Sequence, residues 1–169
     1  SVFYQSSFIS LSSYYHLSPE DSGHYAAFAG VSMCIGLAFV YPIIIQFIQA
    51  RHIALISLGV MSLALIALLA LPGIDSQWIF VAPLSLFVGT CYVALLTLIS
   101  SLSHRHHQGW SLSLASVLLA LAWFITGYLS GLLSHISIHL PTILALIATL
   151  VALCVFIMSR GDVRDVKLR

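Results

Sequence analysis

The chain has 169 residues, of which 60% are hydrophobic and only 7% charged, and its formal net charge is +1. Soluble domains carry about 25% charged residues, so this composition excludes a water-facing globular domain, and the small net charge gives no basis for nucleic-acid binding. The mean hydropathy of +1.08 and several uncharged runs longer than about 18 residues predict an all-α membrane protein.

The first apolar segment, residues 1–17, is rich in aromatic and hydroxyl side chains. From Ser1 to Tyr15 a helix would rise only about 22 Å, less than the bilayer's hydrocarbon thickness of about 30 Å. We therefore expect this crossing to begin upstream, in a longer protein of which the chain is the later part.

The second segment spans about 23–48, and Ser18-Pro19-Glu20-Asp21 marks the start of its helix. Ser suits the N-cap, Pro suits the first helical position, and carboxylates in the first turn face the positive end of the helix dipole. Pro42 lies inside the segment and predicts a kink, because proline cannot donate a backbone hydrogen bond.

Four more crossings follow, at about 53–71, 77–101, 110–133 and 141–159, separated by short polar turns. The loop between the fourth and fifth crossings, Ser103 to Trp110, holds Arg105 beside His104, His106 and His107 and must lie in water. Residues 1–159 thus form a predicted six-helix transmembrane domain, and 160–169 a basic soluble tail.

Charge segregates between the two predicted faces. The three turns or tails on one face hold all six Lys and Arg residues of the chain, whereas the opposite face holds acidic residues. This is the positive-inside pattern, so we expect the basic loops and the C-terminus to be cytoplasmic, in a multi-pass protein of the bacterial inner (plasma) membrane. The basic residues are Arg51, Arg105, Arg160, Arg164, Lys167 and Arg169, and the acidic residues on the opposite face are Glu20, Asp21 and Asp75.

Polarity also differs among the crossings. The third and sixth are nearly pure Leu, Ile, Ala and Val, which suits lipid-facing positions, while the other four carry Gly, Ser, Thr, Tyr, Trp and Gln. The order polar, polar, apolar therefore occurs twice. It predicts two inverted three-helix repeats.

The chain resembles the C-terminal half, helices seven to twelve, of a major facilitator superfamily (MFS) transporter, closest to drug:proton antiporters of the tetracycline-resistance type. The likeness covers the whole chain. Tyr41, Pro42 and Gln46 stand where the family's basic motif usually has a glycine and an acid, so only Arg51 matches that motif. The matching stretches are Leu17-Ser18-Pro19 with Gly23, the turn at Arg51, Gln108-Gly109, and Gly127-Tyr128-Leu129-Ser130-Gly131.

The resemblance implies that helices seven, eight, ten and eleven surround a central pathway. Tyr4, Ser7 and Tyr14 share one helix face by their spacing, and Gln5 lines the cavity or bonds another helix. Trp123 either stacks on a drug or packs against another helix. It lies near one stripe of its helix with Ser116, Thr126, Gly127 and Ser130. The cavity candidates are Tyr4, Gln5, Ser7, Tyr14, Tyr41, Tyr92, Trp123 and Thr126. The expected helix-packing glycines are Gly30, Gly36, Gly127 and Gly131, and the cytoplasmic-loop residues are Arg51, Arg105, Gln108 and Gly109.

No enzymatic chemistry is expected. The sequence has no nucleophile–base pair and no H-E-x-x-H motif, and Cys34, Cys91 and Cys154 fall in apolar runs without metal spacing. The loop histidines lack a nearby Cys or carboxylate, so we expect a solvated turn, and neither a metal nor another cofactor.

The function these features predict is secondary active transport of a small organic or amphipathic solute, such as drug efflux, by alternating access. The expected partners are the lipid bilayer, the solute, and either a missing N-terminal six-helix half or a second copy. No Asp or Glu lies within a crossing, so a proton-coupling carboxylate is expected in the other half. The alternative is a membrane scaffold that transports nothing, or a half-size protein that dimerises.

Overall fold

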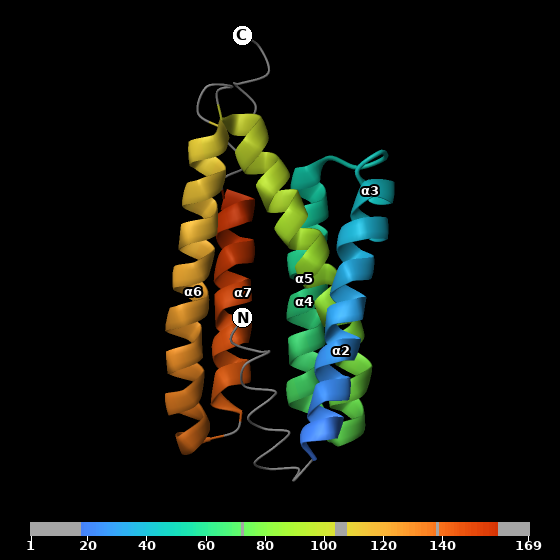
Figure 1. The fold of residues 1–169 in the computed structure, drawn as a ribbon, viewed down its shortest axis with the longest axis vertical. Coiled ribbons are helices and arrows are strands. Elements are labelled where there is room, and N and C mark those ends of the chain that lie inside the picture. The colour runs from blue at the N-terminus through green and yellow to red at the C-terminus, as the bar shows by residue number, and fades with distance from the viewer. Residues whose placement is uncertain (1–17, 72, 104–107, 138, 159–169) are drawn as a thin grey trace.

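A computed structural model of the chain describes residues 18–71, 73–103, 108–137 and 139–158. Its described elements are all helical, and five of these helical spans are long and apolar enough to cross a membrane. They run alternately up and down along one long axis (Figure 1). The elements are α2 Pro19–Ile35, η1 Gly36–Val40, α3 Tyr41–Ile44, α4 Ala50–Ala70, α5 Ile74–Leu102, α6 Gln108–Ile136 and α7 Leu140–Met158.

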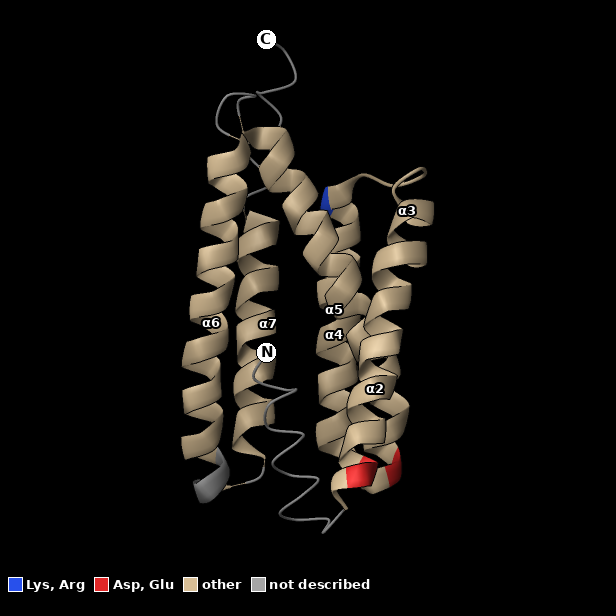
Figure 2. Cartoon of the chain, viewed as in Figure 1, with Lys and Arg blue, Asp and Glu red and all other residues tan. Residues whose placement is uncertain are grey.

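The described ionised residues lie at opposite ends of the bundle. Arg51 is at one end, called here the Arg51 end, and Glu20, Asp21 and Asp75 are at the other, called the acidic end (Figure 2). Between these two ends, the described stretches of the helices carry no Asp, Glu, Lys or Arg. A bundle with charge confined to its two ends is compatible with a multi-pass membrane protein.

The start of α2 follows the predicted chemistry. Ser18 is the N-cap residue, Pro19 comes next, and Glu20 and Asp21 occupy the first turn. The Asp21 backbone N–H donates to Ser18 Oγ at 3.1 Å, and the Ser18 hydroxyl donates to Asp21 Oδ2 at 2.8 Å. The cap thus satisfies one of the donors that a helix start leaves without a partner.

At Pro42, where the sequence predicted a kink, the structure has a π-helical turn just before the proline. Residues Gly36–Val40 form a π-helical turn, in which the Tyr41 N–H reaches back to the Gly36 carbonyl. The predicted segment 23–48 is therefore divided into α2, η1 and α3. Residues 45–49 then form the turn to α4, with Gln49 in an extended conformation.

The helix bounds differ from the predicted ranges mainly at their starts. Ala50-Arg51-His52 belongs to α4 and Ile74-Asp75-Ser76 to α5, where the polar residues suggested turns. At its other end, α6 continues to Ile136. Residues 1–17, the predicted first crossing, lie outside the described residues, as does the tail 160–169.

The expected lipid-facing position of α4 is corrected by the structure. Of the most apolar stretch of α4, 44% of the residues are buried, against none in the corresponding stretch of α6. α4 contacts both α5 and α7. Hydropathy could not show this, because lipid is as apolar as a helix surface and small residues decide which faces pack closely. The small buried residues of α4 are Ala50, Ala54, Ser57, Ser62 and Ala64.

Two apolar clusters hold the described helices together. Near the acidic end, Tyr25 and Ala29 of α2 pack with Leu65 of α4 and Val81 of α5. Near the Arg51 end, Tyr41 packs with Ile53, Ala54 and Ala94. Both clusters join α4 and α5 to the helix formed by α2, η1 and α3, so these elements form the packed part of the bundle.

Candidate functional site

A pocket of about 320 Å³ lies between α5 and α6 near the Arg51 end. Its size is at the lower bound of small-molecule sites. Apolar side chains dominate the lining, with two serine hydroxyls. The pocket therefore suits the apolar part of an amphipathic molecule. Its lining residues are Ile99, Leu102, Ser103, Ser111, Leu114, Ala115 and Leu118.

Gln108 joins α6 to α5 near this pocket. Its Nε2 donates to the Ser100 carbonyl at 3.2 Å, in the last turn of α5, where helix carbonyls lack intrahelical donors. Gln108 was predicted in the cytoplasmic loop and is instead the first residue of α6. Gly109 is exposed in the same turn, and Arg105 lies outside the described residues.

Tyr92 and Thr126 lie on the helix faces that continue from the pocket toward the middle of the bundle. Tyr92 is about two turns before Ile99 on α5, and Thr126 is about three turns after Ala115 on α6. Tyr92 is half-buried, and the Thr126 hydroxyl donates to the Ala122 carbonyl at 2.7 Å. These two predicted residues thus lie on the pocket-side faces of α5 and α6 without lining the pocket itself.

Trp123 lies three residues before Thr126, and 44% of its surface is exposed. About two turns further along the same face, Ser130 is fully buried. The stripe predicted on this helix is therefore buried at Ser130 and about half exposed at Trp123. Trp123 does not line the α5–α6 pocket, and neither do Tyr92 and Thr126.

Tyr41, predicted as a cavity candidate, has a partner on another helix. Its side chain is 8% exposed, and its hydroxyl donates to Thr97 Oγ1 at 2.6 Å. Thr97 in turn donates to the Val93 carbonyl at 2.9 Å. This geometry joins α3 to α5. The remaining cavity candidates, Tyr4, Gln5, Ser7 and Tyr14, lie outside the described residues.

Glycine allows α5 to approach the irregular helix closely. A Cβ on Gly36 would overlap the Leu86 carbonyl, and one on Gly89 would lie 2.8 Å from the Met33 carbonyl oxygen. Gly36 was predicted as a packing residue, whereas Gly89 was not. A Cβ on Gly30 or Gly131 would meet no described atom within 4 Å, and Gly127 is half-buried.

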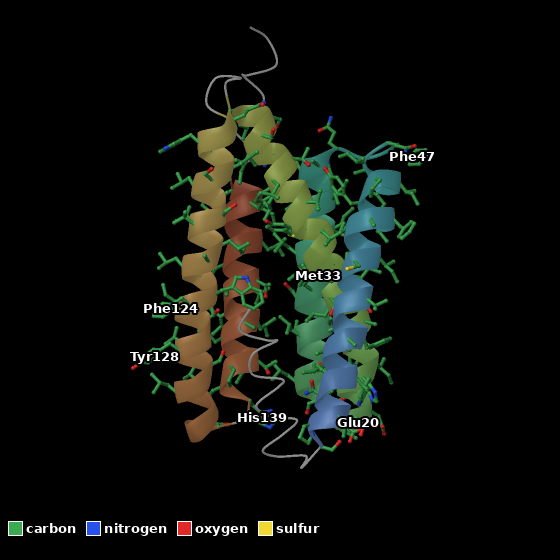
Figure 3. The ribbon with its side chains drawn as sticks, viewed as in Figure 1. Glu20, Met33, Phe47, Phe124, Tyr128 and His139 are labelled. Carbon is green, nitrogen blue, oxygen red and sulfur yellow. The ribbon has the colours of Figure 1, made fainter. Side chains whose placement is uncertain are left out.

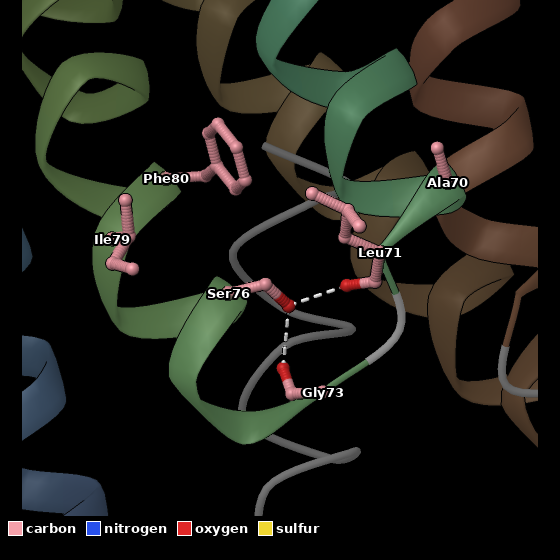
Figure 4. Close-up of a pocket in the computed structure, with 6 residues that line it drawn as sticks. All are labelled: Ala70, Leu71, Gly73, Ser76, Ile79 and Phe80. Atoms are coloured by element: carbon pink, nitrogen blue, oxygen red, sulfur yellow. Dashed lines mark hydrogen bonds between the residues drawn. The ribbon is translucent and has the colours of Figure 1, made fainter.

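A second pocket, of about 460 Å³, lies at the acidic end beside the turn between α4 and α5 (Figure 4). Ile79, Phe80 and Leu71 supply apolar walls. Ser76 Oγ lies 2.5 Å from the Leu71 carbonyl oxygen and 2.7 Å from that of Gly73, so this hydroxyl closes the turn. The pocket contains none of the predicted site residues.

An aromatic cluster at the acidic end was missed by sequence reasoning. The rings of Tyr25 and Trp78 meet edge to face, with centroids 5.4 Å apart, and Phe28 lies 6.1 Å from Trp78. These residues join α2 to α5, and an aromatic residue near each helix start was the available signal. Ring packing thus joins α2 to α5 near the acidic end.

The described residues contain no group of three His, Cys, Asp or Glu side chains able to hold a metal. His104, His106 and His107 lie outside them, so the expectation of a solvated loop stays a prediction. Comparisons with protein families, curated proteins and solved structures found no match for this chain.

Proposed function

We propose that the chain is one half of a secondary transporter that moves a small organic or amphipathic solute by alternating access. In this proposal residues 1–17 form the first of six crossings, the six form two inverted repeats of the MFS type, and the basic end is cytoplasmic. The protein belongs in the bacterial inner membrane and pairs with an N-terminal half or with a second copy.

The observation that carries the proposal is the uncovered surface of α6. Between residues 108 and 133, Ser130 is the buried position. Phe124 and Tyr128 are 74% and 67% exposed and point away from the other helices (Figure 3). The proposed pathway helices have to face a second half across a central cavity, and α6 has the free surface that this requires.

The α5–α6 pocket supports a solute with an apolar part. Its hydroxyls come from Ser103 and Ser111, and Tyr92 is about two turns away on the same face of α5. A few polar groups on an apolar surface are the usual composition of a small-molecule site. The family resemblance adds drug efflux coupled to protons. The crossings of this chain contain no carboxylate, so we place the coupling carboxylate in the other half.

The test is transport by the full-length protein reconstituted in proteoliposomes, with tetracycline and the fluorescent cation ethidium as probes. A pH gradient should drive accumulation of at least one probe, and Trp123→Ala should reduce its initial rate several-fold. Leu132→Ala is the matched control on α6, because Leu132 is also half-exposed but lies near the acidic end. The proposal is contradicted if the initial rate of probe uptake does not change with the pH gradient or in either variant.

The uncovered surface of α6 also fits the second candidate function, a dimerising membrane scaffold. Cross-linking and mass measurement of the protein in nanodiscs distinguish a transporter half from a dimerising scaffold. A stable homodimer that transports neither probe, and that Phe124→Ala dissociates, favours the scaffold.

A further inference from the structure

The helix formed by α2, η1 and α3 has a built-in interruption. The π-turn at Gly36–Val40 redirects the Tyr41 N–H to the Gly36 carbonyl. Pro42 follows shortly after this turn and has no N–H. The Ala38 carbonyl, four residues earlier, therefore lacks its α-helical donor. Sharp bends in helices occur at such π-turns and prolines, so this is where the helix changes direction most easily.

The part before the interruption is fixed to α5. Gly36 packs directly on the Leu86 backbone, and Thr90 Oγ1 lies 3.4 Å from the Gly36 carbonyl oxygen and 2.9 Å from that of Leu86. Thr90 is fully buried. Backbone contact on this scale leaves no room for sliding, so the turn is anchored at its first residue.

The part after the interruption is attached through Tyr41, which packs with Ile53, Ala54 and Ala94, and through one hydrogen bond. Between residues 41 and 49, the side-chain hydrogen bond that the structure shows to another helix is Tyr41 to Thr97, at 2.6 Å. Gln46 bonds back to the Pro42 carbonyl within its own segment. Phe47 is 82% exposed and points away from the bundle (Figure 3).

We propose that Gly36–Val40 is a hinge, and that the Tyr41–Thr97 hydrogen bond is the latch that keeps α3 against α5. With the latch broken, α3 and the turn after it swing away from α5 at the Arg51 end, and the inner surface around Val93 and Ala94 becomes accessible. α2 and the acidic end stay in place. This hinge is a property of α2, η1, α3 and α5. The inference goes beyond the proposed transport and does not depend on it.

The test measures distances between spin labels in the full chain in nanodiscs, after Cys34, Cys91 and Cys154 are replaced by alanine. One pair, Phe47→Cys with Ser101→Cys, spans the turn after α3 and the last turn of α5 at the Arg51 end. The control pair, His24→Cys with Ile79→Cys, spans α2 and α5 at the acidic end. All four positions are exposed, so the labels should not disturb the packing.

Tyr41→Phe or Thr97→Val removes the latch. Each should raise the population of the longer 47–101 distance roughly three- to fivefold, the effect of one helix–helix hydrogen bond, and leave the 24–79 distances unchanged. Thr97→Ser keeps the hydroxyl and should behave like the parent. Adding Pro42→Ala to Tyr41→Phe restores a backbone donor and should narrow the 47–101 distribution again.

Three outcomes would overturn the proposal. In the first, the 47–101 distribution is the same with and without the latch. In the second, both label pairs broaden together, which shows a general loss of packing. In the third, Pro42→Ala leaves the broadened distribution unchanged, which shows that the helix does not bend at the π-turn.

Discussion

The Arg51 guanidinium donates a hydrogen bond to the Phe156 backbone carbonyl at 3.1 Å, and its carbon lies 6.0 Å from the centre of the Phe156 ring. Arg51 is in the first turn of α4, and Phe156 is in the last turn of α7. Carbonyls in a last turn lack intrahelical donors and carry the negative end of the helix dipole. One side chain thus caps α7 and joins it to α4.

Arg51→Ala should lower the free energy of unfolding by about 1 kcal/mol, since a half-exposed charged hydrogen bond is partly screened by water. Amide exchange should rise in the last turn of α7 and remain unchanged at its start. Chemical unfolding in detergent and hydrogen exchange check both effects. Gln49→Ala is the control, because Gln49 makes no capping bond. Equal effects of the two substitutions would contradict the cap.

Gly36→Ala should destabilise the protein by about 2 kcal/mol, the usual cost of adding a carbon to a closely packed contact. The new Cβ would overlap the Leu86 carbonyl, and backbone on both sides cannot yield easily. Gly59→Ala, in α4 with no atom within 4 Å of the added carbon, should be neutral or slightly stabilising because alanine favours helix. Thermal unfolding of the two variants compares them, and equal losses would refute the tight contact.

The architecture of the described chain was largely predictable, and its packing was not. Ser18 and Pro19 signalled a helix start, and Pro42 signalled an irregularity, because capping and proline chemistry depend on neighbouring residues alone. The central position of α4 and the partners of Tyr41 and Gly89 depend on which faces meet. In a membrane, apolar patterning carries little of that information. Among the predicted cavity candidates, spacing could place residues on one helix face, but it could not show that Tyr41 bonds to Thr97 of α5.

The two ends of the bundle should face opposite sides of the membrane. Phe47→Cys, beyond α3 at the Arg51 end, should react with a membrane-impermeant maleimide only from the cytoplasmic side. Asp75→Cys, in the first turn of α5, should react only from the other side. Labelling of intact and permeabilised cells, in a background without the native cysteines, measures this. Reaction of both positions from one side would exclude five crossings in alternating directions.

The buried hydroxyl of Ser57 should lower the stability of the fold slightly. It is 1% exposed, and its buried hydroxyl has no hydrogen-bond partner among the described residues. A buried polar group without a partner is unfavourable, so Ser57→Ala should raise the free energy of unfolding by about 1 kcal/mol. Ser62→Ala on the same helix is the control, because it removes a bond of 2.9 Å to the Leu58 carbonyl and should not stabilise. A loss of stability in Ser57→Ala would show that this hydroxyl has a partner in the membrane, such as a buried water bridging α4 to its neighbours.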